Sequence, residues 1–155
     1  DPGGEIPVED GGFRTDAPTA PQLAFRLLCS MSVRRQWRLK AFDCKTAFLI
    51  GMPHDREIYV RPHREGLPGT VPGSLIKLVK GACGLREAPR LWYLKARQTI
   101  QDARFEELRT GKGAFVLKDC SQPEAPTVGM LVLHVDDECY AGYGKTFGQA
   151  LSHWQ

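Results

Sequence analysis

This sequence lacks any cysteine or histidine pattern that would serve a disulfide framework or a zinc site. Its five cysteines are an odd number without a Cys-x-x-Cys pair, and its four histidines show no ligand spacing. Scattered free thiols are typical of a reducing compartment. No apolar run reaches the roughly 18 residues that a membrane-spanning helix needs, and no signal peptide opens the chain. We therefore expect a soluble, intracellular protein.

A large net charge is also missing. The net charge is only +3 over 155 residues, of which 42% are hydrophobic and 25% charged, as in one ordinary globular domain. This mild positive charge permits a polyanionic partner without requiring one. The basic residues gather in two groups, for which a solvated surface is the usual explanation. The groups are Arg34, Arg35, Arg38 and Lys40, and then Arg86, Arg90, Lys95 and Arg97.

Hydrophobic periodicity predicts helices and strands after an irregular lead-in at residues 1–18. Thr19 as N-cap, Pro21 in the first turn and apolar residues at helical spacing predict a helix over residues 20–35. A second helix is expected over about 88–103 and a third from 144. Strands are expected at 37–43, 57–61, 75–78, 115–118 and in a hairpin over 128–142. This order predicts an α+β fold over residues 19–155, with a largely antiparallel sheet and helices packed on one face.

Two adjacent aspartates, Asp136 and Asp137, interrupt the apolar run of the predicted hairpin. Within a regular strand they would point to opposite faces, whereas at the two-residue tip of a hairpin both can face the same side. Carboxylate oxygens at such a tip suit Mg²⁺. The alternative is a turn in which Asp serves only its turn propensity, and the pair alone does not decide between them.

Two carboxylates need a third oxygen donor to hold two metal ions, and Asp43 stands at the end of the strand predicted over 37–43. Two Mg²⁺ ions about 4 Å apart activate an attacking oxygen and stabilise a departing one in phosphoryl transfer. That chemistry is mostly positioning and charge neutralisation, so aspartates suffice for it. Asp43 as a turn or N-cap residue is the alternative that spacing leaves open.

Four blocks of the sequence resemble the reverse transcriptases of copia-type LTR retrotransposons. FDCKTAFLIG at 42–51 is similar to their "DVKTAFLNG", and EIYVRP at 57–62 is similar to "EIYMxQP". LVKGACGLREAPRLWY at 78–93 resembles "LxKALYGLKQAPRxWY", and HVDD at 134–137 resembles the "YVDD" box. The blocks stand in the family's order, so the chain is identified as a palm-domain fragment of such an enzyme. The resemblance implies the palm of an RNA-directed DNA polymerase, a nucleotidyltransferase acting on template-primer and deoxynucleoside triphosphates.

By this resemblance, Asp43, Asp136 and Asp137 would be the catalytic residues, with Asp43 and Asp136 bridging two Mg²⁺ ions. Mn²⁺ is an alternative ion. The backbone carbonyl of Cys44 would complete one coordination sphere. The expected setting is a retroelement polyprotein, in a cytoplasmic virus-like particle or the nucleus and without a membrane partner.

The resemblance also assigns nucleotide and nucleic-acid contacts. Phe48 falls on the family's steric-gate position, where an aromatic ring excludes ribonucleotides; an ordinary core ring is the alternative. Gly84 would let the backbone approach the nucleotide, and Arg86 would meet its phosphates. Arg90 and His134 would contact template or primer. For the two arginines, a solvated helix start is the alternative.

The sequence departs from the family's pattern at several positions. Cys83 and His134 each replace a tyrosine, Glu87 replaces a glutamine, and Met52-Pro53-His54 disturbs an acidic turn. The N-terminal part of the fingers, the thumb and the ribonuclease H region are expected outside these 155 residues. The rival hypothesis is therefore a degenerate, non-catalytic retroelement fragment or a nucleic-acid-binding module. Another palm-fold enzyme, such as a nucleotidyl cyclase, is a weaker rival, because the block around Gly84 argues against it.

Overall fold

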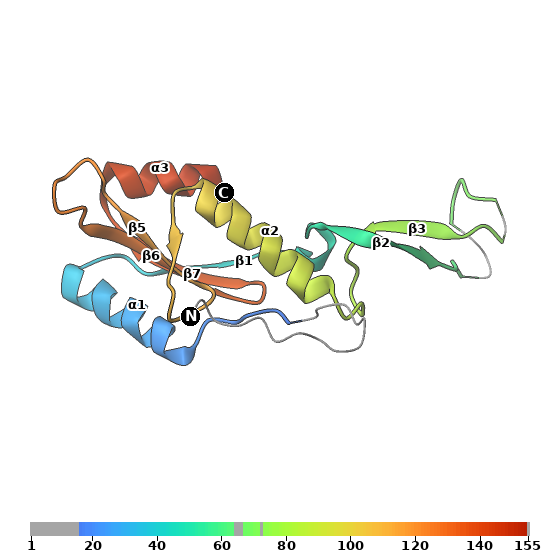
Figure 1. Cartoon of the computed structure of the whole chain (residues 1–155), viewed down its shortest axis with the longest axis horizontal. Coiled ribbons are helices and arrows are strands. Elements are labelled where there is room, and N and C mark those ends of the chain that lie inside the picture. Colours follow the sequence, from blue (N-terminus) through green and yellow to red (C-terminus); the bar gives the residue numbers. More distant parts are fainter. Residues whose placement is uncertain (1–15, 64–66, 72, 155) are drawn as a thin grey trace.

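The computed structural model describes residues 16–63, 67–71 and 73–154, and these form two antiparallel sheets and three α-helices (Figure 1). The α+β class and the antiparallel pairing predicted from the sequence are confirmed. Of the lead-in predicted at residues 1–18, residues 1–15 lie outside the described residues.

The larger sheet has five strands in the order β1-β7-β6-β5-β4, and every pairing in it is antiparallel. Its strands are β1 (Lys40–Asp43), β4 (Glu106–Glu107), β5 (Ala114–Lys118), β6 (Thr127–His134) and β7 (Asp137–Gly142). β6 lies in the middle and forms a hairpin with β7. The short strand β4 was not predicted; its two glutamates lack the apolar alternation that indicates a strand.

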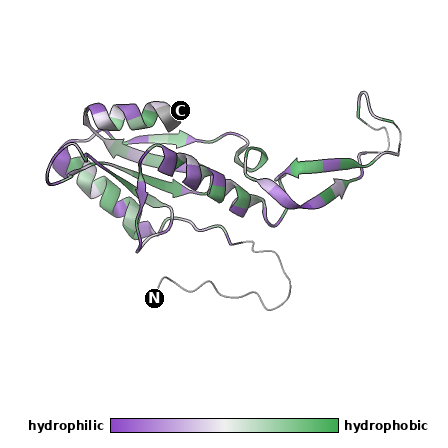
Figure 2. Cartoon of the chain, turned by 45° about the horizontal axis from the view of Figure 1, so that its top comes forward, coloured by the Kyte–Doolittle hydropathy of each residue, from purple (hydrophilic) through white to green (hydrophobic). Residues whose placement is uncertain are grey.

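The helices cover both faces of this sheet, so the prediction that they pack on one face is wrong. α1 (Gln22–Arg35) packs on one face, where Leu28 meets Met130 and Val132. α2 (Ala88–Asp102) and α3 (Gly144–Trp154) pack on the opposite face, in the same core as Leu131 and Leu133. β6 is consequently buried from Val128 to Leu133, and the strands in the middle of the larger sheet are largely hydrophobic (Figure 2). The uninterrupted apolar run at 128–133 is the signal for a strand covered on both sides.

The smaller sheet is a hairpin of β2 (Pro53–Val60) and β3 (Ile76–Lys80), which projects away from the larger sheet beyond the start of α2 (Figure 1). Both strands are longer than predicted. Tyr59 and Val79 are exposed on it. A short 3-10 helix, η1 (Ala47–Leu49), connects β1 with this hairpin and was not predicted.

The start of α1 differs from the prediction. The N-cap is Pro21, whose carbonyl accepts the Ala24 amide at 2.8 Å, and no side chain caps the helix. The predicted capping by Thr19 is therefore wrong, because the backbone turns helical only after Pro21. None of the described helices is both long and apolar enough to cross a bilayer.

Candidate functional site

The turn between β6 and β7 has Val135 and Asp136 at its tip. His134 ends β6 and pairs with Asp137, which begins β7. The prediction that both aspartates occupy the tip is wrong by one residue, since the register gives Asp137 to the strand. Val135 has a φ of 58°, a value that a β-branched residue rarely adopts and that is found mainly where surrounding contacts enforce it.

Asp43 ends β1 directly beside this turn. It is the cross-strand partner of Asp137, and the amide of Cys44 donates to the carbonyl of Asp136 at 2.9 Å. Directly opposed residues of antiparallel strands have Cβ atoms about 4.5–5.5 Å apart and side chains on the same face. The structure therefore brings Asp43, which precedes Asp136 by 93 residues in the chain, to the same end of the sheet as Asp136 and Asp137.

The electrostatic field at this end of the sheet is negative. Burial raises the pKa of the Cys44 thiol, and the charges of Glu138, Asp43 and Asp136 raise it further. Burial likewise raises the pKa of Cys139, assisted by the charge of Asp137. Carboxylate charge thus raises the pKa of two thiols, one directly after β1 and one on β7, and the same charge attracts a cation.

The donor chemistry of this end of the sheet fits a hard divalent cation. Asp43 and Asp137 are exposed and Asp136 is half-buried, so their oxygens are accessible. Within the part of the chain that the structure describes, however, no three His, Cys, Asp or Glu side chains are already gathered around a common point. Holding an ion therefore requires side-chain rotation, which opposed strand ends permit.

Trp92 of α2 contacts the turn between β6 and β7. Its indole N–H donates to the carbonyl of Val135 at 2.7 Å, and its ring is buried in the main core. The contact of Trp92 with the turn was not predicted from the sequence. The signal was available in principle, because a buried indole N–H needs an acceptor.

The predicted nucleotide residues lie where the two sheets join. Phe48 is in η1 and is half-buried against the main core. A Cβ on Gly81 would come within 2.7 Å of the Phe48 carbonyl oxygen, so the turn leading to Gly84 passes close to η1. Gly84 itself has a φ of +95° and open space around its missing Cβ. The gate role of Phe48 and the nucleotide role of Gly84 stay predictions.

The two predicted phosphate-binding arginines have different surroundings. Arg86 is exposed ahead of α2. Arg90 is half-buried and donates to the carboxylate of Asp16 at 3.1 Å and to its backbone carbonyl at 3.3 Å. A nucleic-acid phosphate would therefore compete with Asp16 for Arg90. Neither role is tested by these contacts.

Glu87 forms a cluster that sequence reasoning missed. Its buried carboxylate accepts hydrogen bonds from Arg56 of β2 and lies 3.8 Å from Nδ1 of His54, whose Nε2 contacts the Lys80 carbonyl at 2.9 Å. Two positions that depart from the family's pattern, His54 and Glu87, are thus neighbours in space. We call His54, Arg56 and Glu87 the hairpin clamp, because they tie β2 to the start of α2.

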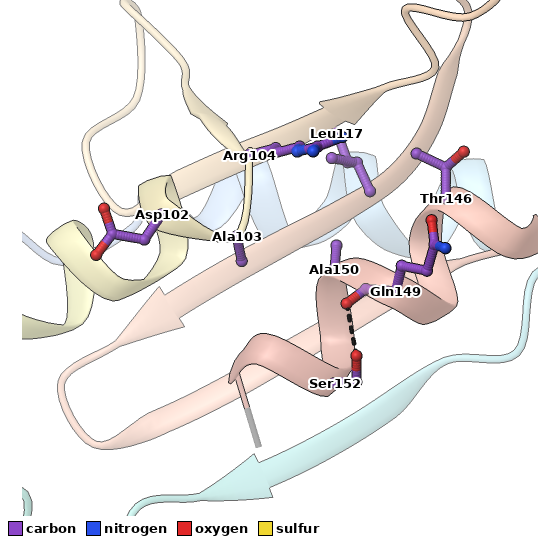
Figure 3. Close-up of a pocket in the computed structure, with 8 residues that line it drawn as sticks. All are labelled: Asp102, Ala103, Arg104, Leu117, Thr146, Gln149, Ala150 and Ser152. Carbon is purple, nitrogen blue, oxygen red and sulfur yellow. Dashed lines mark hydrogen bonds between the residues drawn. The ribbon is translucent and has the colours of Figure 1, made fainter.

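Two of the hollows on the larger sheet lie beside its helices. One, of about 330 Å³, lies between the start of α1 and the β6–β7 hairpin, and His134 and Asp137 are among the residues that line it. The other, of about 260 Å³, lies between the end of α2, β5 and α3, with Arg104 along Leu117 and Thr146 and Gln149 facing it (Figure 3). Leu117 is in register with Gly129 and Gly142, so this second hollow lies far from the aspartates.

Comparison with known proteins adds independent findings. Residues 6–146 match the family model described as "Reverse transcriptase (RNA-dependent DNA polymerase)". The chain is 26% identical over 132 residues to the "Retrovirus-related Pol polyprotein from transposon RE1" of Arabidopsis thaliana, and 26% identical over 128 residues to that from transposon RE2. These matches cover 85% and 83% of the chain but only 9% and 8% of the two relatives. No solved structure matches the chain.

Proposed function

This chain belongs to the reverse transcriptase (RNA-dependent DNA polymerase) family, and we propose that it is the polymerase core of a copia-type Pol polyprotein. It would transfer deoxynucleotides to a primer 3′ hydroxyl on an RNA or DNA template. Because the chain spans less than a tenth of the two relatives, the rest of the polyprotein would supply further segments around this core.

The observation that best supports this function is the pairing of Asp43 with Asp137, together with the bond from the Cys44 amide to the Asp136 carbonyl. It joins the end of β1 to the β6–β7 turn, so three carboxylates from distant parts of the chain share one end of a sheet. A turn that used Asp only for its propensity would need no acidic partner on β1.

Asp43, Asp136 and Asp137 would hold two Mg²⁺ ions, with the Cys44 carbonyl as a further ligand. When bound, such ions lower the charge repulsion at the reacting phosphate and activate the primer hydroxyl. The chain's own residues would contribute oxygen ligands and negative charge, and that charge adds to the effect of burial in raising the pKa of Cys44. Val135 is held in its unusual conformation by Trp92, and this fixes the backbone of the metal-binding turn.

The remaining predicted residues would bind substrate. Phe48 would lie against the deoxyribose and reject a 2′ hydroxyl, and Gly84, with open space above it, would admit the nucleotide. Arg86, exposed before α2, would meet the triphosphate. Arg90 would exchange Asp16 for a template phosphate, and His134 beside Asp137 would contact the primer end.

The test is primer extension with Asp136→Asn. The chain replaces the matching segment of the RE1 polyprotein, so that the flanking segments are present, and incorporation is measured with Mg²⁺ and with Mn²⁺. We expect extension by the parent chain and a loss of at least about 100-fold in Asp136→Asn, since electrostatic stabilisation by such a group is worth that much. Asp55→Asn, an exposed carboxylate on β2, is the matched control and should leave the rate unchanged.

Equal extension by the parent chain and Asp136→Asn would contradict the metal assignment. Absence of extension by a folded parent chain, with binding of template-primer retained, would instead support the nucleic-acid-binding module. Loss of both would indicate a degenerate fragment.

A further inference from the structure

An aromatic and basic cluster lies at the end of the larger sheet opposite the aspartates. The rings of Trp37 and Tyr143 stack with centroids 6.1 Å apart and planes 29° from parallel. The Arg35 guanidinium lies over the Trp37 ring, with Cζ 5.5 Å from its centroid. The three side chains line a hollow of about 260 Å³. We call Arg35, Trp37 and Tyr143 the aromatic platform.

One side of the aromatic platform packs against the core, and the other side is exposed to solvent. Trp37 is only 6% exposed and belongs to the core under α1, whereas Tyr143 is 55% exposed. Arg35 is held by donation of Nη1 to the Thr127 carbonyl at 3.2 Å. The Tyr143 amide donates to the Val128 carbonyl at 3.0 Å, which anchors its backbone next to β6. A flat ring is thus presented to solvent in one orientation, at low entropic cost to a ligand that stacks on it.

Exposed cations lie within three residues of the platform residues in the sequence, and they are Arg34, Arg38, Lys40 and Lys145. Arg34 and Arg35 also stand in the last turn of α1, where a helix terminus favours cations. That explanation does not extend to Arg38, Lys40 or Lys145. The carboxylate of Asp119, close to Thr127 in the neighbouring loop, accepts hydrogen bonds from Ser121 and Gln122. Five basic residues, with Arg35 included, thus stand against this one carboxylate.

We propose that the aromatic platform is a second nucleic-acid site, which binds single-stranded RNA or DNA. One base stacks on the open face of Tyr143, and the flanking phosphates meet Arg35 and Arg38. Flat rings flanked by dispersed cations are the combination that sequence-tolerant single-strand binding uses. An apolar peptide would need a deeper groove than three side chains provide, and an acidic peptide would gain nothing from the exposed ring.

This site goes beyond the proposed polymerase function, because it lies elsewhere. β7 runs from Asp137 at one end to Gly142 beside the platform, which at 3.3 Å per residue is about 20 Å to Tyr143. The end of α1 and the β6–β7 turn lie at opposite ends of the sheet (Figure 1). A strand held at the platform is therefore not the nucleotide at the catalytic end.

The experiment measures binding of fluorescein-labelled oligo(dT) and oligo(U) to the whole chain by anisotropy over a salt series. Loss of one base-stacking contact is worth about 1–3 kcal/mol, so Tyr143→Ala should weaken binding about 5- to 150-fold. Tyr143→Phe keeps the ring and should bind like the parent chain. Arg38→Gln should weaken binding equally for both oligonucleotides and reduce the salt dependence by about one counterion.

Primer extension by Tyr143→Ala in the chimeric polyprotein separates this proposal from the polymerase function. Weaker oligonucleotide binding with retained primer extension supports a separate site, and loss of extension in Asp136→Asn bears only on the polymerase function, so either proposal can fail while the other stands. Unchanged affinity in Tyr143→Ala would overturn the proposal, provided that the thermal unfolding of the variant matches that of the parent chain. Displacement of the oligonucleotide by polyglutamate at equal charge concentration would also overturn it, since a general anion surface would then explain the binding.

Discussion

The hairpins β6–β7 and β2–β3 have similar lengths and opposite surroundings. β6 is buried on both faces by α1 on one side and by α2 and α3 on the other. β2–β3 pairs only with itself, and Tyr59 and Val79 are 51% and 65% exposed on it. Isolated two-stranded hairpins are marginally stable in water. Rigidity is therefore concentrated at the aspartates, whereas β2–β3 depends on its attachment to α2.

The contacts that hold the two hairpins to the rest of the molecule also differ. The β6–β7 turn is held by a buried indole and by a backbone hydrogen bond from the neighbouring strand. β2 is held by the hairpin clamp and by close backbone contact, since the Met52 amide donates to the Leu91 carbonyl at 3.0 Å. Charged contacts respond to pH, whereas apolar packing hardly does. We therefore expect acid to weaken the attachment of β2–β3 before it affects the β6–β7 turn.

The largest expected effect comes from truncating a ring in each region. Phe115 on β5, packed beside β6, is fully buried. Phe115→Ala should lower the free energy of unfolding by about 3–5 kcal/mol through lost burial and a cavity. Tyr59→Ala, on the exposed hairpin, should cost less than about 1 kcal/mol. Urea denaturation followed by circular dichroism measures both, and equal losses would break the comparison.

A smaller and local effect is expected at the hairpin clamp. Glu87→Ala leaves Arg56 and His54 beside an empty site, and hydrogen bonds to charged groups are worth about 1.5–3 kcal/mol. We expect faster amide hydrogen exchange over Pro53–Val60 and Ile76–Lys80, with exchange over Thr127–Gly142 unchanged. Glu87→Gln keeps the shape of the side chain without its charge and should lie between Glu87→Ala and the parent chain.

The clamp should also weaken in acid. Burial by itself raises the pKa of Glu87, but the hydrogen bond and charge of Arg56 and the charge of His54 bring it below its ordinary value of 4.5. A carboxyl with a lowered folded-state pKa stabilises the fold above its ordinary pKa and loses this contribution as pH falls through the folded-state pKa. Acid-induced exchange that spreads over β2–β3 and Thr127–Gly142 alike would contradict the assignment.

The smallest effect is expected from the ion pair within the exposed hairpin. Lys77 contacts Glu57, and both side chains are at least half-exposed. Lys77→Ala should therefore leave the melting temperature unchanged, because exposed ion pairs contribute little. Calorimetry at low and at high salt checks this. A clear drop confined to low salt would show that surface charges help to hold β2–β3.

Local sequence patterns predicted most of the helices and strands, but not which face of the sheet each helix covers. Apolar spacing located the three helices, and turn residues separated the strands. The uninterrupted run Val128–Leu133 was recognised as a strand, yet its lack of alternation, which indicates burial on both faces, was not used. The shift of the turn to Val135 and Asp136 escaped prediction, because a one-residue change of register leaves the local composition the same.

The candidate site was predicted through motifs rather than through contacts. Asp43, Asp136 and Asp137 were named from their blocks, and the strand register places their backbones side by side. Trp92 and Glu87 were not recognised as supports of the two hairpins, since each acts on a residue at least 30 positions away. Nothing in a local window specifies such a partner.

By itself, the amino-acid sequence determined the element types, the family and the positions of the acidic residues, because short-range periodicity and motif order carry that information. Only the tertiary structure decided that Asp43 lies opposite Asp137, that helices cover both faces of the sheet, and that Glu87 meets His54 and Arg56. These features depend on pairing and packing between distant segments, and their free energy exists only once the chain has folded.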